Sequence, residues 1–206
     1  MRRRVQTGDI TGAQLAELRT GGAPVAWDIE TSGLDWKNDQ IATCQVHNGS
    51  VGTLIVQVDG TRPENLSALL EDPGVVKVFH HAPFDLRFMT HHWDVSPARV
   101  GCTKVASRLL NPAKAGSAYS LQSLLLEYLD VVISKEQRTS DWRASELSVA
   151  QIEYAARDVE YLLPLHATLM RLLGEMDRLE YYRKCCDFLP THVLLQTLGW
   201  EDVFAY

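Results

Sequence analysis

Two acidic side chains interrupt an apolar segment that otherwise has the composition of a buried β-strand. The segment is Val25-Ala-Trp-Asp-Ile-Glu-Thr31, and its acidic residues are Asp28 and Glu30. Burying an unpaired carboxylate is costly, so the folded chain must bring positive charge to this strand. Because residues two apart in a strand project from the same face, the two carboxylates need a shared positive partner. No other feature of the sequence constrains the fold as much.

Three further side chains extend this acidic pair. Asp85 ends the segment Phe79-His-His-Ala-Pro-Phe-Asp85, which we expect to join a strand to the first turn of a helix. Tyr154 and Asp158 are four residues apart in a segment with helical periodicity, so both lie on one face of a helix. The carboxylates and the phenol form an ordered set drawn from three separate segments.

The chemistry of this set favours divalent cations that prefer oxygen ligands. Because the set contains no histidine or cysteine, it favours Mg²⁺ or Mn²⁺ over zinc or copper. We expect Asp28, Glu30, Asp85 and Asp158 to bind two ions, which at ~3.5–4 Å separation can hold the attacking and leaving oxygens of a phosphoryl displacement. Tyr154 is expected to orient water and contact the phosphate, because a phenol with a pKa near ~10 is a weak base at neutral pH. The set predicts a metal-dependent phosphodiesterase acting on nucleic acid.

The hydrophobic pattern predicts strands first and mostly helices afterwards. Strands are expected at 24–30, 40–47, 51–58 and 75–80, with a hairpin turn at Asn48-Gly49. Helices are expected at 63–71, from Pro83 onward, and at 102–110, 120–129, 148–170 and 174–188. Ser148 and Gln151 match a capping box, and Pro164 is expected to kink the long helix. Together these elements predict a mixed α/β domain built on one sheet.

Length and composition indicate an ordinary globular protein. The 206 residues, 46% of them hydrophobic, predict a single domain over 1–206, with a catalytic core at about 24–170 and a helical segment at 171–206. We expect no membrane span, because no apolar run approaches ~20 residues. The four cysteines lack zinc-type spacing and predict reduced thiols in the cytoplasm. The net charge of −6 disfavours a processive binder of long duplexes and suits a short substrate gripped through metal ions.

These motifs resemble the DEDD 3′–5′ exonuclease superfamily, in its tyrosine-containing ribonuclease D branch. The resemblance covers roughly residues 24–170 and is carried by Asp28-Ile-Glu-Thr31, His80-His-Ala-Pro-Phe-Asp85, Ser140-Asp-Trp142 and Tyr154-Ala-Ala-Arg-Asp158. It implies a ribonuclease H-like fold, a mixed sheet flanked by helices. It also implies a two-metal exoribonuclease that releases 5′-mononucleotides from the 3′ ends of RNA.

A closer resemblance is to the nano-RNase C family. It is carried by Cys102-Thr-Lys-Val-Ala-Ser107, by Ile133-Ser-Lys135 and by the ending Phe188-Leu-Pro190…Leu198-Gly-Trp200. It implies a ring-shaped homo-oligomer, an octamer in that family, that degrades very short single-stranded RNA including dinucleotides. It also implies that Leu34 wedges between bases. We further expect Thr31, His81 and Tyr154 to contact the substrate. Around His80-His-Ala-Pro-Phe the sequence is closer to ribonuclease D.

Other functions and simpler roles fit some of the same residues. The enzyme could instead trim structured RNA 3′ ends as ribonuclease D does, or degrade DNA, and a non-catalytic nucleic-acid-binding protein is a third alternative. For single residues, we favour a structural role for His80, loop anchoring for Trp142 and core packing for Leu34. The basic residues Lys135, Arg138 and Arg143 either contact phosphates or form a solvated loop. The apolar ending Val203-Phe-Ala-Tyr206 predicts a self-association surface.

Overall fold

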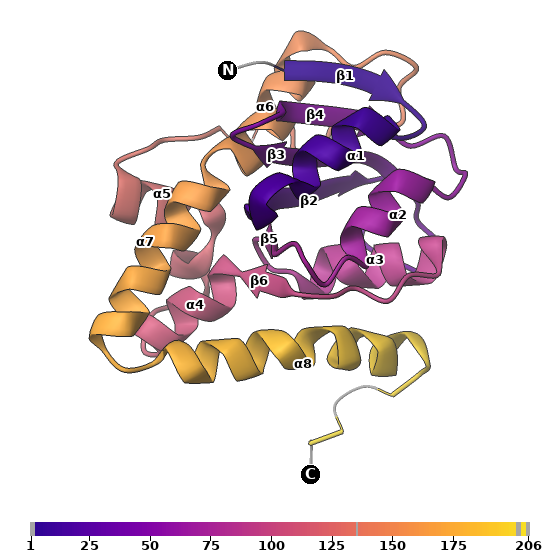
Figure 1. The fold of residues 1–206 in the computed structure, drawn as a ribbon. Helices are drawn as coiled ribbons and strands as arrows, with labels where there is room; N and C mark the ends of the chain where they lie inside the picture. Colours follow the sequence, from indigo (N-terminus) through magenta and orange to yellow (C-terminus); the bar gives the residue numbers. More distant parts are fainter. Residues whose placement is uncertain (1–2, 135, 201–202, 205–206) are drawn as a thin grey trace.

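A mixed six-stranded sheet forms the centre of the molecule (Figure 1). The computed structural model describes residues 3–134, 136–200 and 203–204. The strand order is β1-β4-β3-β2-β5-β6, in which β3 runs antiparallel to both of its neighbours and the other pairs are parallel. The strands are β1 (Arg3–Thr7), β2 (Val25–Thr31), β3 (Ile41–Asn48), β4 (Gly52–Gln57), β5 (Lys77–Phe79) and β6 (Val100–Cys102).

Helices cover both faces of this sheet. In Figure 1, α1 and α2 lie in front of the strands, α6 crosses behind β2, β3 and β4, and α8 runs beneath α3 and β6. The helices are α1 (Gly12–Arg19), α2 (Glu64–Leu70), α3 (Pro83–Trp93), α4 (Thr103–Leu110), α5 (Leu121–Leu129), α6 (Val149–Glu160), α7 (Leu162–Glu175) and α8 (Leu179–Thr197). Two short 3₁₀ helices lie at Thr20–Gly22 and Gly116–Tyr119. The predicted mixed sheet flanked by helices is confirmed.

Successive side chains of β2 point to opposite faces of the sheet, so they belong to two different hydrophobic cores. Trp27 and Ile29 belong to the large core beneath α1 and α2, whereas Ala26 packs with Val159 of α6 and Leu162 of α7. Asp28 and Glu30 share the register of Ala26, so they face α6. The acidic pair is therefore inside the molecule but on the face that α6 covers.

Three elements escaped prediction from sequence. β1 is an edge strand with mostly exposed side chains, so it has no apolar alternation, and β6 has only three residues. α1 buries only a few residues, and its sequence has almost no amphipathic pattern. The hairpin strands, α2 and the start of α3 lie within a few residues of the predicted positions.

The long helix expected at 148–170 is broken in a different place. It ends at Glu160 and restarts at Leu162, so Pro164 lies in the first turn of α7 and not at the kink. Helix starts tolerate proline because their N–H groups have no intrahelical partner. α8 starts at Leu179, later than predicted, and continues past Pro190 to Thr197. Among the described helices, none combines the length and hydropathy needed to cross a membrane.

Candidate active site

The carboxylates of Asp28, Glu30 and Asp158 meet between β2 and α6. One oxygen of each group lies within 4.8 Å of one from each of the other two. Asp28 and Glu30 come from the same face of β2, and Asp158 comes from the last turns of α6. All three side chains are partly exposed, so the cluster is accessible from solvent. The structure thus brings together three of the four predicted metal ligands in a cluster that could hold a cation.

Asp85 reaches the same region from α3. β5 runs parallel to β2, so the loop that follows β5 and the end of β2 lie at the same edge of the sheet. The buried Asp85 carboxylate accepts a hydrogen bond of 3.2 Å from the backbone N–H of Ile29, between the two acidic residues of β2. This bond places the Asp85 carboxylate beside β2, and repulsion from it adds to the effect of burial in raising the pKa of Asp28.

Small residues allow α6 to approach the sheet closely. Ala155 and Ala156 are fully buried and pack with Ile55 and Trp142, which brings the neighbouring Tyr154 and Asp158 over β2. The predicted capping box at Ser148 and Gln151 is confirmed and fixes where this helix begins. The Gln151 amide also donates to Ser140 Oγ at 3.2 Å and to the Asp141 carbonyl at 2.9 Å. These bonds, with the buried Trp142, hold the preceding loop against the helix, so the anchoring role expected for Trp142 is confirmed.

The clustered carboxylates lack an internal positive partner. Burial, followed by mutual repulsion, raises the pKa of Glu30 to about 9 and places the pKa of Asp28 well above its usual range. Burial likewise raises the pKa of Asp85 to about 8 and of Asp158 to about 7. Within the described part of the chain, no ion pair involves any of the four. An all-oxygen set with this surplus of negative charge suits Mg²⁺ or Mn²⁺.

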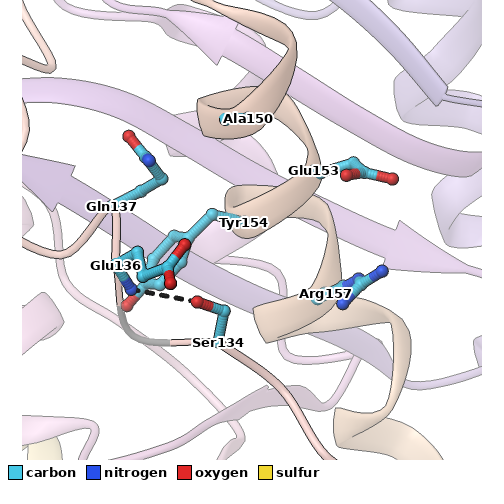
Figure 2. Close-up of a pocket in the computed structure, with 7 residues that line it drawn as sticks. All are labelled: Ser134, Glu136, Gln137, Ala150, Glu153, Tyr154 and Arg157. Atoms are coloured by element: carbon cyan, nitrogen blue, oxygen red, sulfur yellow. Dashed lines mark hydrogen bonds between the residues drawn. The ribbon is translucent and has the colours of Figure 1, made fainter.

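Tyr154 lies between the acidic cluster and a small hollow on the outer side of α6. The hollow, about 110 Å³, is lined by Ser134, Glu136, Gln137, Ala150, Glu153, Tyr154 and Arg157. Figure 2 shows the Tyr154 ring extending from the helix toward Ser134 and Glu136, and the Glu136 N–H donates to Ser134 Oγ at 3.1 Å. Burial, together with the carboxylates of Asp158, Glu30 and Asp28, raises the pKa of Tyr154. The phenol therefore keeps its proton at neutral pH.

A cleft of about 520 Å³ adjoins the cluster. It is lined by Glu30, Thr31, Ser32, Gly33, Leu34, Phe84, Arg138, Thr139 and Ser140. Leu34 is 83% exposed, so the expectation that it packs in the core is wrong. Leu34 lies in the bend that follows Ser32 and Gly33 after the end of β2, and the type of a residue alone does not show such exposure.

The loop that carries Leu34 is held by its own polar groups. The Asp39 carboxylate accepts hydrogen bonds from Ser32 Oγ at 3.2 Å and from the Asp35 N–H at 2.9 Å. Thr31 Oγ1 donates to the Gly33 carbonyl at 2.6 Å. A Cβ atom at Gly33 would lie 2.3 Å from Asp39 Oδ2, so any larger residue there would displace the Asp39 carboxylate that holds the loop. The loop thus presents Leu34 at a fixed place beside the acidic cluster.

A group of cations surrounds His81, after β5. His81 has a φ of 66°, and partial burial of its imidazole, followed by repulsion from Lys104, Arg87 and Arg108, lowers its pKa to about 4. None of these three cations forms an ion pair with a described carboxylate. His80 instead bonds through Nδ1 to Thr103 Oγ1 at 2.9 Å, in line with the structural role expected for it.

The remaining basic residues divide between cleft and surface. Arg138 lines the cleft, and Arg143 is exposed beside a different hollow, near β3 and β4. Lys135 lies outside the described residues. Sequence reasoning did not single out Gln45, whose amide donates to Asp28 Oδ2 at 3.1 Å. The only signal for it was a polar residue within the apolar strand at 40–47.

Comparisons with known proteins identify relatives of this chain. A family model described as 3′–5′ exonuclease matches residues 5–174. Ribonuclease D of Haemophilus influenzae is 29% identical over 193 residues, 93% of this chain and 48% of the relative. Ribonuclease D of Escherichia coli is 31% identical over 165 residues, 80% of this chain and 43% of the relative. The chain thus spans about half the length of the curated relatives it matches.

Solved structures show the same fold over the whole chain. Brucella melitensis NrnC has a TM-score of 0.90 at 36% identity, covering 99% of this chain and 98% of its own. Structures of that nuclease also exist with bound Mg²⁺ and bound to pGG. Escherichia coli RNase D, described as an exoribonuclease involved in structured RNA processing, has a TM-score of 0.83 at 25% identity, covering 94% of this chain and 51% of its own. The exonuclease fold expected from sequence is confirmed.

Proposed function

The chain belongs to the 3′–5′ exonuclease family, and from this premise we propose that it removes 5′-mononucleotides from the 3′ ends of short single-stranded RNA. The observation that carries the proposal is the convergence of Asp28, Glu30 and Asp158 at one end of a cleft that also presents Leu34. As an enzyme of the ribonuclease D and NrnC type it hydrolyses phosphodiester bonds. The RNA preference, the short substrate and the number of metal ions belong to the proposal.

The acidic cluster would hold the metal ions that this chemistry needs. Asp28, Glu30 and Asp158 would supply oxygen ligands, and Asp85, which bonds to the backbone between Asp28 and Glu30, would contribute to a second site. Bound Mg²⁺ or Mn²⁺ would activate water and stabilise the charge that develops on the phosphate. Binding would also favour the ionised carboxylates, which repel one another without it.

Tyr154 would act as a hydrogen-bond donor. Its raised pKa keeps the hydroxyl protonated, so the phenol can donate to the phosphate or orient a water but cannot remove a proton at neutral pH. Burial raises the pKa of Asp158 to about 7, and a hydrogen bond from the Tyr154 hydroxyl to this carboxyl group offsets part of the rise. This role agrees with the one predicted from sequence.

The surroundings of the cluster favour short substrates. Leu34 and Phe84 offer apolar surface in the cleft to bases near the scissile bond, and Thr31 lies beside them. His81 and its cations follow β5, the parallel neighbour of β2, so they flank the same sheet edge and suit the phosphate at the other end of a very short chain. pGG, by its notation a 5′-phosphorylated guanine dinucleotide, is bound by the Brucella nuclease.

We also propose that the chain acts as a homo-oligomer in the cytoplasm. Along α8 and its extension, large apolar side chains are exposed, namely Tyr181, Phe188, Leu194, Leu198, Trp200, Val203 and Phe204. Apolar surface of this extent is unusual on a monomer and supports self-association. A ring of eight subunits, as in the family that the chain resembles, would bury this apolar surface between neighbouring subunits. The cysteines are free thiols, as a reducing compartment requires. Light scattering that showed only a monomer would refute the oligomer.

The product pattern tests the proposed substrate. A 5′-labelled oligoribonucleotide series that includes the dinucleotide should be shortened from the 3′ end in Mg²⁺ or Mn²⁺, with the dinucleotide among the best substrates. Asp28→Asn, which keeps the side-chain shape, should remove this activity while the circular dichroism spectrum is unchanged. Faster turnover of a structured RNA or of the matching DNA would favour ribonuclease D-like trimming or a DNA exonuclease. Equal activity in Asp28→Asn would refute the assigned site.

A further inference from the structure

Gln45 contacts the acidic cluster from β3, the strand that pairs with β2. It lies on β3 directly opposite Asp28, is fully buried, and its amide Nε2 donates to Asp28 Oδ2 at 3.1 Å. Among the hydrogen bonds of the described residues, this is the only one to the Asp28 carboxylate. The bond uses Oδ2 of the Asp28 carboxylate and leaves Oδ1 for a cation.

Packing alone does not explain why a polar amide is buried at position 45. Its Oε1 atom is also buried and has no hydrogen-bond partner among the described residues. A buried amide that makes one bond where it could make more is less stable there than an apolar side chain of similar shape. Gln45 therefore occupies a position at which stability alone would favour an apolar residue.

Thr43 provides an internal comparison. It lies two residues before Gln45 on the same face of β3, opposite Glu30, and is equally buried. Its Oγ1 atom has no hydrogen-bond partner among the described residues, so it makes no bond to Glu30. The contact with a carboxylate of the cluster is thus specific to Gln45 and not shared by every polar residue on this strand.

A neutral donor suits a metal ligand better than a charged one. A lysine or arginine in place of Gln45 would neutralise the cluster and compete with the cation for it. The amide fixes the rotation of the carboxylate without reducing its charge. Hydrogen bonds of this kind to ligating side chains orient them and raise metal affinity.

We propose that Gln45 is a positioning residue that orients the Asp28 carboxylate for binding of the divalent cation. The inference rests on the proposed metal-dependent function. It adds a residue on β3, a strand that carries none of the predicted ligands.

Gln45→Met tests the inference, because methionine keeps the length and burial of the side chain but cannot donate. Thr43→Val is the matched control, since it removes a buried polar atom from the same face without losing a bond to a carboxylate. Mn²⁺ binding without substrate, followed by electron paramagnetic resonance, should be weakened by roughly 10- to 100-fold in Gln45→Met and unchanged in Thr43→Val. Excess Mn²⁺ should restore much of the turnover lost in Gln45→Met.

The outcomes separate the inference from the function on which it rests. If wild type fails to bind Mn²⁺, the proposed metal site and the inference both fail. If wild type binds and a folded Gln45→Met binds equally well, only the positioning role is refuted. A lower melting temperature of the metal-free variant with unchanged Mn²⁺ affinity would show that Gln45 is merely structural. Gln45→Leu provides the same comparison if Gln45→Met does not fold.

Discussion

Neutralising one carboxylate of the cluster should stabilise the metal-free protein, and by more as the pH rises. Glu30 is the clearest case, because its pKa rises from 4.5 to about 9 on folding. A group whose pKa is higher in the folded state binds more protons when folded, so the free energy of unfolding falls as the pH rises. For Glu30 this loss extends from pH 4.5 to about pH 9. Glu30→Gln keeps the shape of the side chain but cannot ionise, so it should remove this loss of unfolding free energy at high pH.

The magnitude follows from the pH interval over which Glu30 is forced to stay protonated. Near pH 8 the interval above its ordinary pKa of 4.5 is about 3.5 pH units, which at ~1.4 kcal/mol per unit gives an upper limit of ~5 kcal/mol. Protonation of a neighbouring carboxyl group and entry of water relieve part of the repulsion, so we expect a gain of ~2 kcal/mol. For a chain of this size, that gain raises the melting temperature by roughly 4–8 °C.

Thermal unfolding in a chelator at several pH values provides the assay. Glu30→Gln should melt well above wild type near pH 8 and at nearly the same temperature near pH 4.5, where Glu30 in the unfolded chain is itself half protonated. Glu146→Gln is the matched control, because Glu146 is exposed and belongs to no described ion pair. Adding Mg²⁺ should raise the melting temperature of wild type more than that of Glu30→Gln. A wild type and variant that melt together at every pH would show that the cluster carries no electrostatic strain.

Three other substitutions separate the roles of the surrounding residues. Tyr154→Phe should lower kcat by about 10- to 100-fold, the value of a hydrogen bond to a charged group, while Mg²⁺ still raises the melting temperature; an unchanged kcat would remove Tyr154 from the chemistry. Leu34→Ala should raise KM for a dinucleotide by roughly 10-fold without changing thermal stability, because Leu34 is 83% exposed; lost stability would indicate packing instead. Lys104→Gln should raise KM for a 5′-phosphorylated dinucleotide several-fold at low salt. KM for the unphosphorylated dinucleotide should be unchanged. An equal effect on both substrates would refute a site for the terminal phosphate.

Periodicity was enough to place the acidic residues on common faces. Asp28 and Glu30 are two apart in β2, and Tyr154 and Asp158 are four apart in α6, so each pair had to project together whatever the tertiary structure. These regularities are local, and they survive in the folded chain. Asp85 was expected only in the first turn of the helix after the 75–80 strand, and its approach to β2 comes from the parallel pairing of β5 with β2.

Contacts between distant segments could not be predicted in the same way. The bond from Gln45 to Asp28 depends on the register of β3 against β2, which the sequence of β3 alone does not specify. Exposure of Leu34 depends on a loop held by Asp39, a residue with no visible signal. β1 is held to β4 and by an ion pair between Arg3 and Glu160 of α6, so its strand structure comes from tertiary contacts and not from its own composition.

The acidic cluster lowers the stability of the metal-free protein, because buried carboxylates repel one another there. β2 packs with α3 in the core that contains Trp27 and Leu86, and with α6 through Val159 on the opposite face. This packing forces like charges together without a described cation among them. The core must therefore outweigh the repulsion when no metal is bound. A chain selected only for stability would replace these carboxylates with neutral residues, as Glu30→Gln does. The clustering of these carboxylates without a neutralising side chain is the physical argument for the proposed divalent-cation site.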